Sequence, residues 1–369
     1  MRYYIIAGEA SGDLHGANLM RALLRQDADA HFRFWGGDAM QDVAGPPIRH
    51  IRDLAIMGFV EVVSHLGTVL GNIRFCKEDI LQYRPDVLIT IDYPGFNLKM
   101  AKFAHQQGIK TVHYISPQLW AWKKGRIKGM RHNLDRLCYI LPFEQDFYAH
   151  NNFPQAVYVG HPLLDAVAQF KEHDSDDLQY EKPIVALLPG SRQQEIKRML
   201  PLMLELADNH PEYQFVIAGM TLIGEKLYRD IIGNRANVTV CLDRTYQLLS
   251  HAHAAIVCSG TATLETALFN VPQVVCYRAN AVSVAIARRL IGTRIKYISL
   301  VNLIADSPIV TELIQGDCNT TQLEQTFTCI TADSASRQKM LNEYAHLHTL
   351  LGNAGASDRT AEVIIHLLH

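Results

Sequence analysis

The sequence predicts an α/β protein with two Rossmann-like domains whose parallel sheets face each other across a cleft. At 369 residues the chain is longer than one hydrophobic core usually supports. Short apolar runs alternate with helical segments from end to end, which is typical of parallel strands joined by crossover helices. A charged stretch at 171–183 interrupts this alternation. We therefore expect domains at 1–170 and 180–350, with a carboxyl-terminal helix at 352–369 that returns to the first domain.

The predicted strands are continuous apolar runs rather than alternating patterns. Such runs suit parallel strands that helices cover on both faces. They lie at 3–7, 32–35, 87–91, 111–115, 137–141 and 157–159 in the first half, and at 184–188, 214–218, 238–241, 255–258 and 273–277 in the second. Ligands of such sheets bind beyond the carboxyl ends of the strands, so functional residues are sought just after each strand.

The composition argues against several kinds of partner and cofactor. The formal net charge is -2, whereas a nucleic-acid-binding protein favours a strongly basic face. No run reaches the roughly 18 apolar residues that a membrane span needs. The seven cysteines include no CxxC pair, as expected of reduced thiols in the cytosol. The Asp27-Ala28-Asp29 sequence lies at the wrong end of its sheet for a divalent metal, and no His/Cys cluster has zinc spacing, so we expect neither metal nor cofactor.

The first strand is followed by a turn at 8–13 with two glycines. Glycine permits a tight turn with exposed backbone amides, and Ser11 or Asp13 can cap the helix that follows. The turn is neither GxGxxG nor a P-loop, which disfavours NAD and ATP. Two interpretations stay open: a capped turn, or a substrate contact through the backbone amides with Glu9 and Ser11.

Asp92 follows the most apolar run of the first half. A carboxylate at the carboxyl edge of a sheet can take the proton of an alcohol that attacks a sugar. Asn97 can hold a hydroxyl group in place. The alternative is an Asx turn that opens a helix.

The segment after the next strand combines aromatic and basic residues. Aromatic faces suit sugar rings, and cations suit a phosphate. The alternative is a pair of core tryptophans beside a solvated basic helix. The candidate residues here are Ser116, Trp120, Trp122 and Lys123.

Two junctions of the second half, by which we mean the turns that join a predicted strand to the helix after it, indicate a nucleotide site. Gly190 and Ser191 can present helix-terminal N–H groups to phosphate oxygens, and Arg192 can add a charge-assisted hydrogen bond. Glu265 lies one helical turn after Thr261, where a carboxylate can accept both hydroxyls of a ribose. Capped turns with a solvated glutamate remain the alternative. The hydroxyls and amides of the second junction belong to Ser259, Gly260 and Thr261.

An apolar stripe runs through 57–81 at three- and four-residue steps, the pattern of one helix face. Such a stripe packs into a core, or it binds acyl chains or a membrane surface. The candidates for the second role are Val62, Leu66, Val69, Leu70 and Ile73.

Taken in order, these segments resemble the lipid-A-disaccharide synthase family. The resemblance spans nearly the whole chain, and its specificity comes from the ordered set rather than from any one motif. The matching segments are GEASGD (8–13), MGFVEV (57–62), PDVLITIDYPGFN (85–97), GIKTVHYISPQLWAW (108–122), LPFE (141–144), VGHPL (159–163), LLPGSR (187–192), SGTATLE (259–265), YR (277–278) and YISLVNL (297–303).

The resemblance implies a GT-B fold and an inverting glycosyl transfer. The donor would be UDP-2,3-diacylglucosamine, the acceptor 2,3-diacylglucosamine 1-phosphate, and the product a β-1,6-linked disaccharide with release of UDP. Asp92 matches the family's essential aspartate, Arg192 its phosphate-site arginine, and Asn302 lies in a motif expected to contact UDP. The resemblance also implies a cytoplasmic protein on the inner face of the inner membrane, and a homodimer that exchanges carboxyl-terminal parts.

Two other functions fit the same residues. A UDP-GlcNAc epimerase would use the nucleotide site without a lipid acceptor. A non-catalytic nucleotide-sugar or lipid-binding protein would keep Arg192 and Glu265 but would not need Asp92.

Overall fold

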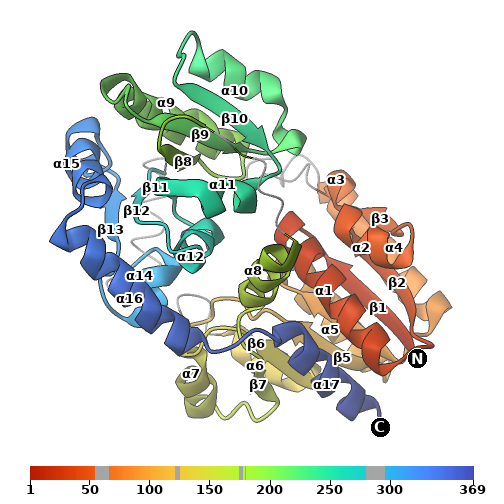
Figure 1. The fold of residues 1–369 in the computed structure, drawn as a ribbon. Helices are drawn as coiled ribbons and strands as arrows, with labels where there is room; N and C mark the ends of the chain where they lie inside the picture. The colour runs from red at the N-terminus through yellow and green to blue at the C-terminus, as the bar shows by residue number, and fades with distance from the viewer. Residues whose placement is uncertain (55–65, 121–124, 174–177, 179, 280–295) are drawn as a thin grey trace. The chain divides into compact units, whose positions relative to one another are not determined.

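The computed structural model describes residues 1–54, 66–120, 125–173, 178, 180–279 and 296–369. They form two compact units, one of Met1–Asp165 with Asn353–His369 and the other of Ala166–Gly352 (Figure 1). Each unit contains its own sheet, and every strand pairing in both sheets is parallel. The predicted fold class, α/β with two Rossmann-like domains, is confirmed.

The sheet of the first unit has seven strands in the order β3-β2-β1-β4-β5-β6-β7. Its strands are β1 (Arg2–Ala7), β2 (His31–Gly36), β3 (Arg49–His50), β4 (Val87–Ile91), β5 (Lys110–Tyr114), β6 (Arg136–Tyr139) and β7 (Ala156–Tyr158). The helices are α1 (Ala10–Gln26), α2 (Asp38–Ala44), α3 (Ile51–Leu54), α4 (Leu66–Tyr83), α5 (Pro94–Gln106), α6 (Arg126–Asn133), α7 (Glu144–His150), the start of α8 (Pro162–His173), and α17 (Ala356–Leu368).

The central strands of this sheet are fully buried because helices pack on them. Tyr4, Ile6 and Leu88 form an apolar cluster with residues of α4 and α5. The buried polar groups of Trp35 and Tyr4 in this core are hydrogen-bonded. The Trp35 indole N–H donates to the Tyr4 hydroxyl at 3.0 Å. The hydroxyl of Tyr4 in turn donates to Asp79 at 2.7 Å.

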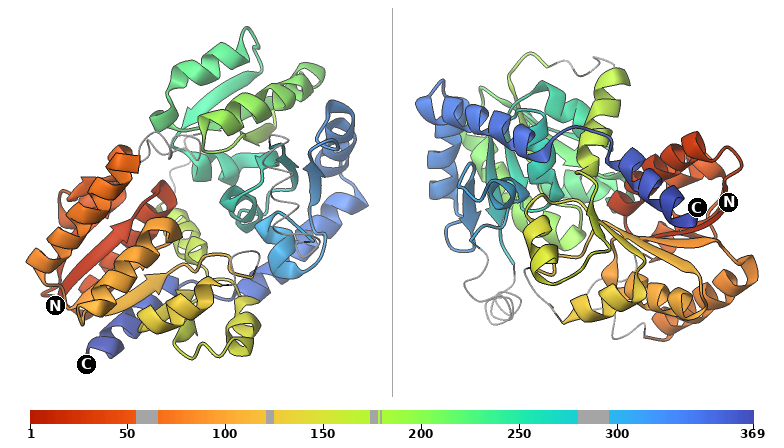
Figure 2. Two further views of the ribbon diagram at one scale, coloured as in Figure 1. Left: turned by 180° about the vertical axis from the view of Figure 1, so that it is seen from behind. Right: turned by 90° about the horizontal axis from the view of Figure 1, so that it is seen from below.

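The carboxyl-terminal helix α17 belongs to the first unit and packs against α1 (Figure 2). Its first turn is capped from a distant part of the chain by the Asp165 carboxylate. That carboxylate accepts backbone N–H groups from Gly355, Ala356 and Ser357 at 2.6, 3.1 and 2.8 Å. Three charge-assisted hydrogen bonds at a helix amino terminus fix where this segment returns.

The sheet of the second unit has six strands in the order β10-β9-β8-β11-β12-β13. They are β8 (Ile184–Leu188), β9 (Gln214–Gly219), β10 (Val238–Leu242), β11 (Ala252–Cys258), β12 (Gln273–Tyr277) and β13 (Thr311–Ile314). The helices are α9 (Gln193–Asn209), α10 (Glu225–Ile232), α11 (Thr245–His251), α12 (Thr261–Leu268), α14 (Leu300–Ala305), α15 (Thr320–Thr331) and α16 (Ala335–Leu351), with a 3-10 turn at Thr221–Ile223.

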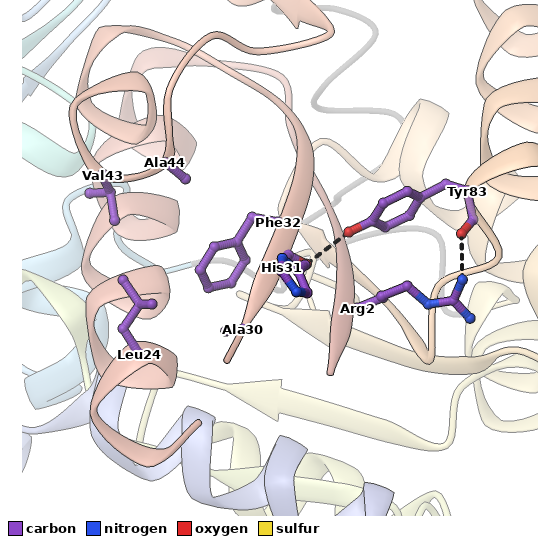
Figure 3. A pocket seen from close by; sticks show the side chains of 8 residues that line it. All are labelled: Arg2, Leu24, Ala30, His31, Phe32, Val43, Ala44 and Tyr83. Carbon is purple, nitrogen blue, oxygen red and sulfur yellow. Dashed lines mark hydrogen bonds between the residues drawn. The ribbon is translucent and has the colours of Figure 1, made fainter. Parts of the chain in front are cut away.

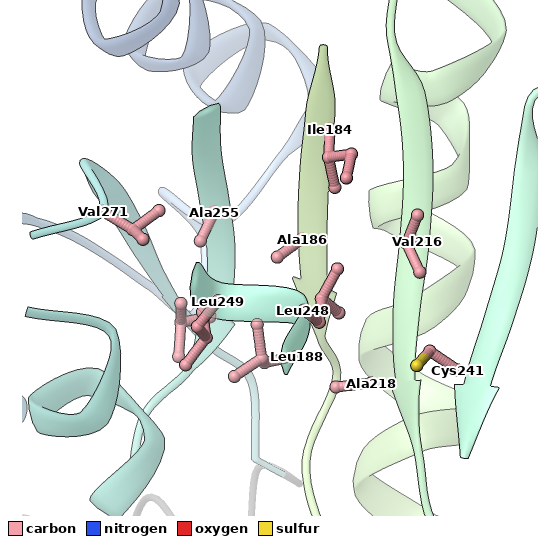
Figure 4. Packing of buried hydrophobic residues seen from close by; sticks show 11 residues of the cluster. Ile184, Ala186, Leu188, Val216, Ala218, Cys241, Leu248, Leu249, Ala255 and Val271 are labelled. Atoms are coloured by element: carbon pink, nitrogen blue, oxygen red, sulfur yellow. The ribbon is translucent and has the colours of Figure 1, made fainter. Parts of the chain in front are cut away.

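Alternate residues of these strands form an apolar layer on one face of the sheet. Ile184, Ala186 and Leu188 of β8 lie in one buried cluster with Leu248 and Leu249 of α11 (Figure 4). Val185 and Leu187, which point to the opposite face, are also fully buried. Burial on both faces explains why the strand is continuously apolar.

Every predicted strand is present, with bounds within three residues of the prediction. The prediction omits β3 and β13. β3 has only two residues, and the sequence of β13, TELI, contains two polar side chains. Neither offers the continuous apolar run on which the prediction relies.

Candidate active site

The strand register brings the junctions of the first unit to one edge of the sheet. Ala7 pairs with Ile91, and Ile91 pairs with Tyr114, so β1, β4 and β5 end at the same level. Glu9 and Asp92 follow directly at that edge, and the segment that begins with Ile115 follows beside them. Residues predicted from separate motifs therefore meet at one place within this unit.

Asp92 is held in an unusual backbone conformation. Its φ is 44° and that of Tyr93 is 48°. Both values lie in the left-handed region of backbone conformation, which residues other than glycine rarely adopt. The Asp92 N–H donates to the Tyr114 carbonyl at 2.9 Å. The Asn97 side-chain amide donates to the carbonyls of Asp92 and Ile91 at 2.7 and 3.0 Å. These bonds fix the backbone of Asp92 at the carboxyl edge of the sheet.

The role of Asn97 in the structure is therefore to support Asp92. Its side chain is completely buried, and its amide nitrogen also reaches the Ile6 carbonyl at 3.4 Å. Within the described residues, its Oδ1 has no hydrogen-bond partner. A contact between Asn97 and a substrate hydroxyl stays a prediction.

The electrostatic surroundings of Asp92 suit a general base. Burial, and secondly the negative charge of Glu9, raises the pKa of Asp92 to about 6, and a backbone hydrogen bond from Tyr93 opposes the shift. A carboxylate with this pKa is ionised at neutral pH yet is a better proton acceptor than an ordinary aspartate.

The glycine after β1 is required by Tyr93. A Cβ atom at Gly8 would lie 2.6 Å from Cγ of the Tyr93 ring, so only glycine lets this ring lie against the turn. The turn thus contacts the residue next to Asp92.

The predicted capping of the first helix by Ser11 or Asp13 is wrong. α1 already begins at Ala10, with Glu9 as its N-cap residue and no side-chain cap. Asp13 lies inside the helix and accepts backbone N–H groups of Gly37 and Met40 at 2.6 and 3.1 Å, which fixes the start of α2. Ser11 is exposed in the first turn of α1, so its contact with a substrate stays a prediction.

The segment after β5 is tied to α7. Buried Ser116 shares a short hydrogen bond with the hydroxyl of Tyr148. The Trp120 ring packs edge-to-face on Phe143, with 5.1 Å between ring centroids. Trp122 and Lys123 lie outside the described residues.

Sequence reasoning did not single out Glu144, which begins α7. This carboxyl group is fully buried, and burial raises its pKa to about 8 against the opposing hydrogen bond from the Leu141 N–H at 3.2 Å. Its position in the LPFE segment directly after β6 is a signal that could have revealed it.

The apolar stripe divides along α4. Cys76 and Ile80 are core residues, whereas Leu70 is 59% exposed. Val69 and Ile73 line a small pocket of about 40 Å³ whose other residues include Tyr93. Val62 lies outside the described residues, and Leu66 begins the helix.

The register of the second unit also aligns its two glycine-containing junctions. Leu188 pairs with Val257, so the turns after β8 and β11 are neighbours. Gly190 has a φ of 114°, and a Cβ atom there would lie 2.8 Å from the Cβ atom of Glu195. Glycine is therefore required on both grounds.

The Glu195 side chain lies at the turn that is predicted to bind a diphosphate. Its Oε2 accepts the backbone N–H groups of Ser191 and Arg192 at 3.2 and 3.3 Å. Its Oε1 lies 3.6 Å from the Arg192 guanidinium, which is 70% exposed. Two amides and a guanidinium thus face one carboxylate, and the bond from the Arg192 N–H to Glu195 belongs to a capping box at the start of α9.

The second junction, after β11, leads into α12, a helix without a side-chain cap. The carboxylate of Glu265 on this helix accepts a hydrogen bond. Gly260 is the N-cap residue of α12 and supplies no side-chain cap, and Thr261 is exposed beside it. The Ser259 hydroxyl donates to the Ile298 carbonyl at 3.0 Å. Glu265 Oε1 accepts the Tyr246 hydroxyl at 3.0 Å, a contact that sequence reasoning missed.

Asn302 is engaged within the protein. It is 1% exposed, and its amide donates to the Val310 carbonyl and to Glu312, both at 2.9 Å. Glu312 also accepts the N–H groups of Ile298 and Ser299, each at 2.9 Å. Asn302 therefore organises the segment around Ser299, and its contact with UDP stays a prediction.

A pocket of about 500 Å³ lies away from these junctions, at the amino ends of β1 and β2 (Figure 3). Arg2 and Tyr83 are among its lining residues, and the Tyr83 hydroxyl donates to the His31 carbonyl at 2.9 Å. Sheets of this kind bind ligands at the opposite edge, so this pocket is not a candidate for the chemistry.

The described part of the chain offers neither a metal site nor a membrane-spanning helix. No group of three His, Cys, Asp or Glu side chains there could hold a metal ion. No described helix combines the length and hydrophobicity that crossing a membrane would require.

Sequence comparison identifies relatives over the whole chain. A family model described as lipid-A-disaccharide synthetase matches residues 3–364. The lipid-A-disaccharide synthase of Geobacter sulfurreducens is 35% identical, with 100% of this chain and 97% of that protein covered. The enzyme of the same name from Syntrophus aciditrophicus is 38% identical, with 99% and 97% covered.

Structural comparison finds the same fold at low identity. A UDP-GlcNAc 2-epimerase from Neisseria meningitidis bound to UDP-GlcNAc has a TM-score of 0.70 at 13% identity, with 99% of this chain and 100% of that chain covered. A co-structure of S. aureus MnaA with UDP has a TM-score of 0.71 at 12% identity, with 100% and 96% covered. At this identity the likeness shows the GT-B arrangement of two Rossmann-like domains and no more.

Proposed function

The chain belongs to the lipid-A-disaccharide synthase family, and from that premise we propose the substrates and the chemistry of its reaction. It is a glycosyltransferase of lipid A biosynthesis. The donor is UDP-2,3-diacylglucosamine and the acceptor is 2,3-diacylglucosamine 1-phosphate. The 6-hydroxyl of the acceptor attacks the anomeric carbon opposite UDP, which inverts that centre and forms a β-1,6 bond.

In this proposal Asp92 is the general base. It takes the proton of the 6-hydroxyl while the oxygen forms its bond to the anomeric carbon. The observation that carries the proposal is the position of Asp92: it follows a buried strand, is held by the Asn97 amide, and has a pKa raised to about 6. An ionised base with that pKa suits catalysis near neutral pH.

The second unit binds the donor, and its fixed positive groups stabilise the departing diphosphate. Arg192 and the amides of Gly190 and Ser191 serve this role, with the amides and hydroxyls of Ser259, Gly260 and Thr261. The convergence of two N–H groups and Arg192 on Glu195 supports an anion site in this turn. A diphosphate would compete with the Glu195 carboxylate for these groups. Glu265 accepts the ribose hydroxyls, and Asn302 completes the UDP site.

The first unit binds the acylated acceptor. Its polar contacts are proposed for Glu9, Ser11, Asn97, Ser116, Trp120, Trp122 and Lys123. Exposed Leu70, with Val69 and Ile73 at the small pocket, supports a surface for acyl chains or the inner membrane that would also include Val62 and Leu66. A homodimer remains part of the proposal.

The direct test is to incubate the purified protein with both acylated substrates and to follow UDP release and the disaccharide product. UDP release that depends on the acceptor supports the proposal. Conversion of UDP-GlcNAc without an acceptor would show an epimerase instead, and nucleotide binding without UDP release would show a binding protein.

A further inference from the structure

Tyr246 and Glu265 form a hydrogen-bonded pair in the second unit. The Tyr246 hydroxyl, on α11, donates to Glu265 Oε1, on α12, over 3.0 Å. Among the described residues, no other group hydrogen-bonds this carboxylate. One carboxylate oxygen is therefore fixed by the protein, whereas Oε2 keeps its capacity to accept hydrogen bonds.

The Tyr246 ring is itself part of an aromatic cluster with Phe170 and Phe269, whose own ring centroids are 5.6 Å apart. Phe170 packs edge-on at 5.7 Å between ring centroids, and Phe269 lies at 5.3 Å. Because aromatic neighbours restrict the ring, its hydroxyl reaches Glu265 from one fixed direction. Tyr246 is thus a rigid donor rather than a mobile surface residue.

The pair also controls the charge on Glu265. Burial raises the pKa of Glu265, and the hydrogen bond from Tyr246 lowers it. Burial and the neighbouring negative charge of Glu265 raise the pKa of Tyr246 well above its usual value, so the phenol remains protonated and continues to donate. The hydrogen bond therefore favours the ionised carboxylate, which is the stronger acceptor for a hydroxyl group.

We propose that Tyr246 is a positioning residue for nucleoside recognition: by holding Glu265 Oε1, it directs Oε2 toward the hydroxyls of the donor's ribose. This inference rests on the proposed function, in which Glu265 binds the ribose. Tyr246 itself does not touch the nucleotide. Its loss should weaken the recognition of ribose hydroxyls and leave the rest of the nucleotide site intact.

The test measures the dissociation constants of UDP, 2′-deoxy-UDP and 3′-deoxy-UDP by calorimetry, for the full chain and its variants. The unsubstituted protein should prefer UDP over at least one deoxy analogue by about 10-fold or more, the scale of a hydrogen bond to a charged group. Tyr246→Phe keeps the ring packed against Phe170 and Phe269 but lacks the donor, and it should lose most of that preference. Affinity for the deoxy analogues should change little.

The control variant is Tyr228→Phe, which removes another hydroxyl of the same unit, the one that accepts the Met220 N–H at 3.1 Å. It should keep the preference for UDP even if it is less stable. A Tyr246→Phe protein with the full preference would overturn the inference.

The variant Glu265→Gln distinguishes a wrong role for Tyr246 from a wrong assignment of Glu265 to the ribose. If Glu265→Gln loses the preference while Tyr246→Phe keeps it, the ribose site stands and the role of Tyr246 is wrong. If the unsubstituted protein shows no preference, the assignment of Glu265 to the ribose is itself wrong.

Discussion

The side-chain amide of Asn97 donates a 2.7 Å hydrogen bond to the backbone carbonyl of Asp92. This bond links the first turn of α5 to the residue that directly follows β4, and it supports two consecutive residues with positive φ. The proposed base is therefore positioned through its backbone.

Replacing Asn97 should impair both stability and catalysis. Asn97→Ala removes the side-chain donor of the Ile6, Ile91 and Asp92 carbonyls, which should cost about 1–3 kcal/mol of unfolding free energy. The rate of UDP release should fall as the Asp92 backbone relaxes. Urea denaturation and kinetics on the same sample test both effects. A variant that is destabilised but has unchanged kcat would show that Asn97 does not position Asp92.

Gly8→Ala should disturb the backbone around Asp92 through its neighbour Tyr93. The added methyl group would lie 2.6 Å from the Tyr93 ring, and overpacking of this kind typically costs about 1–3 kcal/mol. Gly95→Ala is the matched control, because a Cβ atom there meets nothing within 4 Å. Thermal unfolding of the two variants should differ clearly. Equal melting temperatures would contradict the packing of Tyr93 on Gly8.

Arg192→Ala should fold normally, because the guanidinium is 70% exposed and its ion pair with Glu195 is a surface contact. The turnover rate should fall at least ~100-fold, the usual scale for an electrostatic group in catalysis. Arg192→Lys keeps the charge without the forked geometry and should retain part of the rate. Near-normal turnover by Arg192→Ala would remove this residue from the mechanism.

The pH dependence follows from the raised pKa of Asp92, which is about 6. Below that pH the base is protonated, so kcat/KM should fall about tenfold per pH unit. The free energy of unfolding changes in the opposite direction to kcat/KM and rises as the pH falls, because the folded protein binds this proton more tightly than the unfolded chain does. Ionised Asp92 therefore disfavours the folded state above about pH 6, and this effect decreases as the pH falls from about 6 towards 3.8, the ordinary pKa of an aspartate. Asp92→Asn should be at least as stable as the unsubstituted protein at neutral pH, as measured by urea denaturation.

The fold and the position of the site were predictable because apolar runs and glycine turns are local signals. Asp92 is visible as a polar residue directly after a buried strand, and the turn at Gly190 as a glycine turn shortly after another. The side-chain contacts that hold the functional residues and the helix ends cannot be predicted from such local patterns. Tyr246 meets Glu265 from another helix, and Asp13 caps α2 rather than its own helix. Such contacts depend on the packing of helices on the sheet, which no local pattern encodes.

The most direct test of the account is UDP release by Asp92→Asn with both acylated substrates, alongside its affinity for UDP. The account predicts a folded protein with unchanged UDP affinity and a rate at least ~100-fold lower, because only the proton acceptor is lost. Near-normal turnover by this variant would contradict the assignment of Asp92 as the base.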